Sequence, residues 1–187
     1  MQTLRYFNRE ALLKVDEAVK VSEELVNNHF KMSSGQWLKN RYDIKTAKDL
    51  AAHEHVNGPF AQVIKYEGRK KDMPLGSSSF SLYTICLQDG AILSNVEKKH
   101  LLLEPFLLYV LTHELVHVVR FSKFKHRYEN KNEADVTLGE ERKVHGLTHY
   151  ILKSMSVPGL KQVFEFYKDW LLVPGSEVHG KKLDDPA

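Results

Sequence analysis

The most apolar stretch of the chain runs from Leu103 to Phe121 and has the sequence LEPFLLYVLTHELVHVVRF. Pro105 is well suited to the first turn of a helix, and neither Gly nor Pro interrupts the run from Phe106 to Val119. Such a helix would be apolar on almost every face, apart from a few polar residues near its middle. We therefore predict a central helix that is buried on most sides.

Amphipathic helices are predicted on both sides of this stretch. Asn8 can cap a helix that continues to about Asn28, because apolar residues recur there at intervals of three and four. The same spacing predicts helices from Glu133 to Met155 and from Leu160 to Leu171, and a Pro-Gly pair follows each of them. A shorter helix is expected from Thr46 to Val56, before Asn57-Gly58-Pro59.

Two segments have the composition and alternation of strands, namely Phe60–Glu67 and Phe80–Leu87. Asp89-Gly90, followed by the apolar residues 91–93, is a typical hairpin signal. The region Met32–Asp43 is expected to be a loop. Together these patterns predict an α+β fold, in which a small antiparallel or mixed sheet packs on the central helix and further helices surround it.

The chain length favours a single domain, because 187 residues with 42% hydrophobic content can form one substantial core. We expect this domain to span residues 1–187. It would consist of a helical N-terminal part (1–58), the strands and the central helix (60–121), and two C-terminal helices (133–173). Cys86 is the only cysteine, so we expect neither an internal disulfide nor a cysteine-rich zinc site.

Charge and hydropathy narrow the expected partners. The net charge is +3 and no long block of like charges occurs, so nucleic acid is not an expected partner. The N-terminal residues lack the uninterrupted apolar core of a secretion signal, and no stretch has the length of a membrane span. We therefore expect a cytoplasmic protein without membrane contact. The oligomeric state stays open.

The central stretch contains His113-Glu114-Leu115-Val116-His117. Histidines four residues apart on a helix have Cβ atoms about 5–6 Å apart on one face, close enough for both imidazoles to bind one metal ion. Glu114 lies beside them, where its carboxylate can accept a proton from a metal-bound water, as in the HExxH pattern of zinc hydrolases. A buried polar network without a metal is the alternative, but a metal ion would satisfy all three side chains together.

A second histidine pair is interpreted differently. His53 and His55 flank Glu54 at a spacing of two, which places them on different faces of a helix, so they cannot share a metal ion while helical. We interpret this motif as a solvated helix end rather than a second metal site.

The motif HELVH at 113–117, together with EERKVH at 140–145, resembles the gluzincin type of zincin metalloprotease. The resemblance covers roughly Ser79 to Met155 and implies a zincin-like fold. The longer metzincin motif is absent, because it would require Gly and His where this chain has Arg120 and Lys123. In gluzincins, the third zinc ligand is a glutamate from a separate downstream helix.

Glu140 and Glu141 are the candidates for that ligand. Glu141 and His145 lie four residues apart and project together, whereas Glu140 aligns with the apolar positions of its helix. The resemblance thus implies a Zn²⁺ ion bound by His113, His117 and Glu141, with Glu140 or His145 as alternative third ligands. Otherwise, the two glutamates would be ordinary surface acids that the helix dipole favours in the first turns.

The resemblance also implies a zinc metallopeptidase that acts on a peptide or protein substrate. Glu114 would be the general base. His145 would be a catalytic residue that orients a ligand or stabilises the negative oxygen of a tetrahedral intermediate. The substrate would lie extended along an edge strand, for which Phe80–Leu87 is the candidate.

Two other functions stay open from the sequence. One is a metal-binding module of zincin-like fold without catalysis. The other is a carboxylate-bridged di-iron helix bundle, which needs two Glu-x-x-His pairs; Glu97–His100 and Glu114–His117 would supply them.

Overall fold

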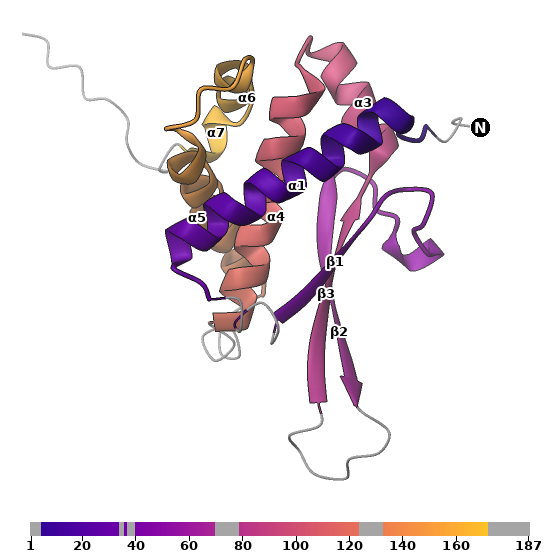
Figure 1. Ribbon diagram of the computed structural model, residues 1–187, viewed down its shortest axis with the longest axis vertical. Helices are drawn as coiled ribbons and strands as arrows, with labels where there is room; N and C mark the ends of the chain where they lie inside the picture. The colour runs from indigo at the N-terminus through magenta and orange to yellow at the C-terminus, as the bar shows by residue number, and fades with distance from the viewer. Residues whose placement is uncertain (1–4, 34–35, 37–39, 70–78, 124–132, 172–187) are drawn as a thin grey trace, which may run out of the picture.

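The computed structural model of the protein describes residues 5–33, 36, 40–69, 79–123 and 133–171. In chain order, the elements are α1 (Arg9–Phe30), β1 (Asn40–Lys45), the 3₁₀ helix η1 (Ala52–Glu54), β2 (Ala61–Arg69), β3 (Ser79–Leu87), α3 (Asp89–Lys98), α4 (Leu103–Lys123), α5 (Glu133–Leu152), α6 (Leu160–Phe166) and α7 (Lys168–Leu171). Figure 1 shows α4 between the sheet on one side and α5, α6 and α7 on the other, with α1 crossing in front. The elements therefore form layers around α4.

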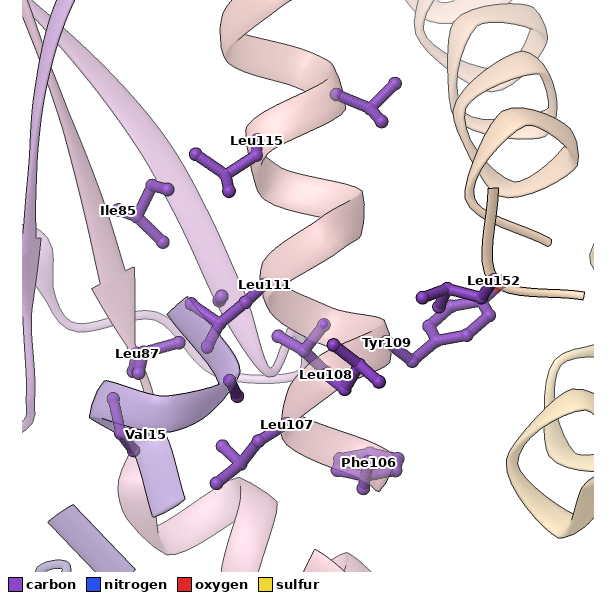
Figure 2. Close-up of a cluster of buried hydrophobic side chains, with 14 of the residues drawn as sticks. Val15, Ile85, Leu87, Phe106, Leu107, Leu108, Tyr109, Leu111, Leu115 and Leu152 are labelled. Carbon is purple, nitrogen blue, oxygen red and sulfur yellow. The ribbon is translucent and has the colours of Figure 1, made fainter. Parts of the chain in front are cut away.

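Helix α4 lies at the centre of the hydrophobic core. Every residue from Pro105 to Val119 is buried, as the apolar sequence predicts. In Figure 2, Leu111 and Leu115 point towards Ile85 of β3, whereas Leu152 of α5 lies on the opposite side of α4. Fully burying an aliphatic side chain stabilises a fold by about 1.5–3 kcal/mol, so this packing contributes strongly to the stability of the fold.

The sheet has the strand order β1-β3-β2, with β1 parallel and β2 antiparallel to β3. Ile85 of β3 lies opposite Ile44 of β1 and Val63 of β2. The two predicted strands and the α+β fold with a small mixed sheet are thus confirmed. Because β3 is paired on both sides, the prediction that Phe80–Leu87 is an edge strand is wrong. The edges of the sheet are β1 and β2.

The N-terminal part of the chain contains a strand that the sequence analysis missed. Asn40–Lys45, of which all but the last two residues fall in the predicted loop, forms β1 and pairs with β3. The helix expected from Thr46 to Val56 is reduced to the short helix η1. A strand whose partner lies about forty positions later leaves little local signal, because its hydrogen bonds depend on the rest of the fold.

The predicted hairpin at Asp89-Gly90 is also wrong, because Asp89 begins helix α3. The carboxylate of Asp89 is buried and accepts hydrogen bonds from the backbone N–H groups of Phe7 (2.8 Å) and Ala47 (2.9 Å). Asp89 thus connects three distant segments of the chain. These long-range bonds, rather than the turn preference of Asp-Gly, determine the local structure.

Helix α1 begins as predicted, since the Asn8 side chain accepts a hydrogen bond from the N–H of Ala11 (2.8 Å). Its buried face packs along α4. Within this seam, Thr112 Oγ1 donates to the carbonyl of Leu108 (2.7 Å) and lies 3.0 Å from Ser22 Oγ. Ser22, the polar residue that interrupts the apolar stripe of α1, therefore has a buried hydrogen-bonding partner.

The C-terminal helix predicted from Leu160 to Leu171 is divided at Tyr167 into α6 and α7. Gly159 precedes α6 with a positive φ of 84°, which reverses the chain direction after α5. Among the described helices, none combines the length and apolarity needed to cross a membrane.

Candidate metal centre

Polar residues of α4 and α5 meet on one face of α4. Tyr109, His113 and His117 recur at intervals of four and therefore share one face of α4. Glu141 and His145 of α5 contact this face. The site thus forms between two packed helices, in the position that the sequence predicts for its ligands.

The potential ligand atoms converge closely. His113 Nε2 and His117 Nε2 are 3.1 Å apart. The carboxylate of Glu141 lies 3.3 Å from His113 Nε2, through Oε2, and 3.1 Å from His117 Nε2, through Oε1. Within the described ranges, these three residues form the only such group of His, Cys, Asp or Glu, with ligand atoms all within 4.8 Å of one another.

This geometry fits a tetrahedral metal ion. Bonds of about 2.0–2.1 Å from zinc to nitrogen or oxygen place neighbouring ligand atoms about 3.3 Å apart, close to the distances found here. The Nδ1 atoms of His113 and His117 are buried and make no hydrogen bond to the described residues. Both rings therefore direct their polar interactions through Nε2. Two imidazole nitrogens and a carboxylate that face one another are a donor set that a divalent cation satisfies.

Of the two candidate glutamates, Glu141 lies at the histidines and Glu140 does not. Glu140 is buried and forms an ion pair with Arg120 instead. Burial raises the pKa of Glu141, but hydrogen bonds from His113 and His117 outweigh this effect and hold the pKa well below its ordinary value. Glu141 is thus an anionic carboxylate at neutral pH, the form that binds a metal ion.

Glu114 is buried next to the two histidines, and the three side chains line one cleft. Burial raises its pKa and the charge of Glu141 raises it further, whereas His113 and His117 act in the opposite direction. A carboxylate with a raised pKa accepts protons more readily near neutral pH. Its environment therefore suits the general base that the sequence predicts.

His145 contributes a neutral ring to the site. Its Nδ1 is 2.9 Å from the hydroxyl of Tyr109, and its ring lies 4.3 Å from that of His113 and stacks on Trp170 at 4.8 Å. Burial lowers the pKa of His145 to about 3, and the nearby His113 acts in the same direction. The ring is therefore uncharged at neutral pH and faces the cleft as a hydrogen-bonding group.

A cleft of about 590 Å³ is lined by these residues. Its other walls come from the beginning of β2, from aromatic side chains of α4 and α7, and from Tyr167 between α6 and α7. They include Phe60, Gln62, Val63, Phe121, Tyr167 and Trp170. The cleft therefore combines a polar cluster with apolar walls and the edge strand β2, which is typical of a ligand-binding pocket.

The sequence analysis missed the aromatic part of this site. Tyr109 precedes His113 by four residues, so the helical spacing that links the two histidines also includes this tyrosine. Tyr167 packs flat on Tyr109, with ring centroids 4.2 Å apart, and Trp170 follows it three residues later. The spacing of Tyr167 and Trp170 in the sequence indicates only an amphipathic helix. The helix against which they pack depends on the tertiary fold.

Two other motifs have structural roles. Glu97 is exposed and forms an ion pair with Arg5 (2.8 Å between Nη1 and Oε2), so it is not a buried carboxylate of the kind that the di-iron interpretation requires. His53 and His55 are exposed, but Glu54 between them is buried. The interpretation of this motif as a solvated helix end is therefore correct for the histidines and wrong for the glutamate.

No protein-family model matches this chain, and it has no match among curated proteins or solved structures.

Proposed function

We propose that this protein is a zinc-dependent metallopeptidase of zincin-like architecture. The observation that carries the proposal is the convergence of His113, His117 and Glu141 beside the buried Glu114, in a cleft that the edge strand β2 lines. Each of these polar side chains, taken alone, is also compatible with a purely structural role. Their combination matches the parts that hydrolysis of an amide requires: a cation site, a proton acceptor and a surface for the substrate.

The residues of the site have complementary roles in this proposal. His113, His117 and Glu141 would hold the zinc ion, which when bound would supply a water with a pKa of about 7 and a Lewis acid for the scissile carbonyl. Glu114 accepts the proton of the attacking water and transfers it to the leaving amine. His145, which Tyr109 orients through Nδ1, donates a hydrogen bond to the oxygen that becomes negative.

The substrate would bind as an extended chain along β2. Among the described strands, β2 pairs only with β3, so its other edge offers backbone N–H and C=O groups to a peptide. Backbone pairing gives affinity without strong selectivity, and the apolar walls of the cleft favour apolar side chains near the scissile bond. The edge strand of the proposal is thus β2, in place of Phe80–Leu87.

Elemental analysis and peptide cleavage test this function. The purified chain should contain about one zinc ion, which His113→Ala and Glu141→Ala should both lose. Glu114→Gln should retain zinc and lower kcat on a cleaved peptide by about 10²–10⁴-fold, because it removes the proton acceptor without removing a ligand. Glu97→Gln, an exposed change outside the site, is the control and should leave both measurements unchanged.

Each outcome separates one part of the proposal. A chain that takes up no metal after reconstitution would contradict the metal centre. A zinc-loaded chain that cleaves no member of a broad peptide library would be a metal-binding module without catalysis. Full activity in Glu114→Gln would show that another residue is the proton acceptor.

A further inference from the structure

A buried ion pair lies directly beside the candidate metal centre. Arg120 of α4 donates two parallel hydrogen bonds to Glu140 of α5, from Nε to Oε1 and from Nη2 to Oε2 (2.9 Å). The side chains are 15% and 6% exposed, respectively. A two-point contact between guanidinium and carboxylate fixes orientation as well as distance, which a single point charge does not.

The position of this pair in the sequence connects it to the ligands. Arg120 follows His117 by three residues, about one helical turn, and Glu140 immediately precedes Glu141. Consecutive residues of a helix point about 100° apart, so Glu140 and Glu141 cannot face the same partner. When Glu140 binds Arg120, the adjacent Glu141 faces His113 and His117.

Further along α5, a second directional contact with α4 is the hydrogen bond between Tyr109 and His145 (2.9 Å). Val144 and Leu152 are fully buried there, and apolar packing of this kind is largely insensitive to small rotations. Leu138 and Gly139 are exposed, so Glu140 is the first buried side chain of α5 among those the structure describes. The ion pair is therefore placed to control the rotation of α5 where the third ligand lies.

We propose that Arg120 is a positioning residue of the metal centre: by binding Glu140, it orients α5 so that Glu141, and not Glu140, is the third ligand. The proposal rests on the metal centre of the preceding section. It assigns to Arg120 an effect on metal affinity, although Arg120 is not one of the three candidate ligands.

Zinc affinity of the full-length chain, measured by competition with a chromophoric chelator at neutral pH, tests this role. Arg120→Gln should weaken zinc binding by about 10–100-fold, the range for partners that orient metal ligands. Arg120→Lys should restore part of the loss, because it keeps the charge but not the two-point contact. The cobalt-substituted Arg120→Gln protein, at saturating cobalt, should show a changed visible absorption spectrum, which loss of stability alone would not produce.

Lys45→Gln is the matched control. Lys45 pairs with another buried glutamate, Glu54, outside the metal centre (2.8 Å). This variant should unfold at a lower denaturant concentration but bind zinc within about twofold of the unmodified chain, because no ligand neighbours the pair.

Several results would overturn the proposal. The proposal is wrong if Arg120→Gln has the zinc affinity and the cobalt spectrum of the unmodified chain. It is also wrong if Arg120→Gln loses no more zinc affinity than Lys45→Gln does. If Arg120→Gln does not fold, a folded Arg120→Lys variant with the zinc affinity of the unmodified chain would also overturn the proposal. If the unmodified chain binds no zinc, the metal centre itself is contradicted. If the unmodified chain binds zinc tightly and substitution of Arg120 does not change the affinity, only this inference is contradicted.

Discussion

At the scale of single residues, Glu54 shows how a buried carboxylate can stabilise the fold without belonging to the site. It is 1% exposed and accepts hydrogen bonds from Lys45 Nζ (2.8 and 3.0 Å), the N–H of Ala51 (2.7 Å) and the hydroxyl of Tyr66 (2.9 Å). These donors connect η1 with β1 and β2. A group with so many donors is held in its ionised form.

The stability of the protein should therefore depend on pH through Glu54. The hydrogen bond from Lys45, followed by that from Ala51, lowers the pKa of Glu54 from 4.5 to about 2. The stabilisation is fully present above the unfolded-state value of 4.5 and is lost as the pH falls towards 2. Glu54→Gln should lower the free energy of unfolding by about 1–3 kcal/mol at neutral pH.

Urea unfolding of both proteins at neutral pH and at acidic pH checks this prediction. The difference between the unmodified chain and Glu54→Gln should shrink as the pH falls below 4.5, because the carboxylate is protonated there in the unfolded chain but stays ionised in the folded protein down to a pH of about 2. A difference that stays constant with pH would show that Glu54 contributes through packing rather than charge.

At the scale of elements, the turn between α5 and α6 depends on Gly159. Its φ of 84° lies in the left-handed region, and an added Cβ would be 2.9 Å from Leu102 Cδ1 and 3.2 Å from Pro105 Cγ. Gly159→Ala should therefore lower the free energy of unfolding by about 1–3 kcal/mol. It should also displace the segment from α6 to α7, whose Tyr167 and Trp170 line the cleft.

Gly146 provides the control for this prediction, because it lies inside α5 and a Cβ there would meet nothing within 4 Å. Gly146→Ala should raise the free energy of unfolding by about 0.5–1 kcal/mol, since alanine favours the helix. The two changes should thus have opposite signs in urea unfolding. A stabilising Gly159→Ala would contradict the strain assigned to that turn.

The long helices could be predicted from the sequence, and the order of the sheet could not. Spacing of apolar residues and the cap at Asn8 are local signals, so α1, α4 and α5 follow from them. Other contacts join segments that are far apart in the sequence. They are the pairing of Asn40–Lys45 with β3 and the hydrogen bonds that Asp89 accepts from Phe7 and Ala47. No local pattern encodes such contacts, so β1 was missed and α3 was mistaken for a hairpin.

At the scale of the whole molecule, a metal ion would stabilise the fold as well as the site. The ligands come from α4 and α5, so an ion held by them joins two layers. Free zinc at about a thousandfold above its Kd stabilises the folded state by about 4 kcal/mol. For a chain of this size, removing the metal with a chelator should lower Tm by about 8–16 °C.

Thermal unfolding with and without chelator measures this effect. His113→Ala should unfold at a temperature that the chelator does not change, because it lacks a ligand. An equal decrease in this variant and in the unmodified chain would show that the chelator acts elsewhere.

The candidate site could be predicted only in part, for a similar reason. His113, Glu114 and His117 lie within one helical turn, so their proximity follows from helix geometry alone. The choice of Glu141 over Glu140 was possible from the face it shares with His145. By contrast, the cleft walls at β2 and Trp170 come together only when separate layers pack. The same holds for the pairing of Glu140 with Arg120.

The seam between α1 and α4 has a consequence for synthesis of the chain. Ser22 and Leu108, which meet in this seam, are separated by 86 positions in the sequence. At about 5–20 residues per second, a ribosome needs roughly 4–17 s to make the intervening chain. During that time the apolar stripe of α1 has no α4 to cover it. Helix α1 thus exposes its apolar stripe to solvent until the central helix has been made.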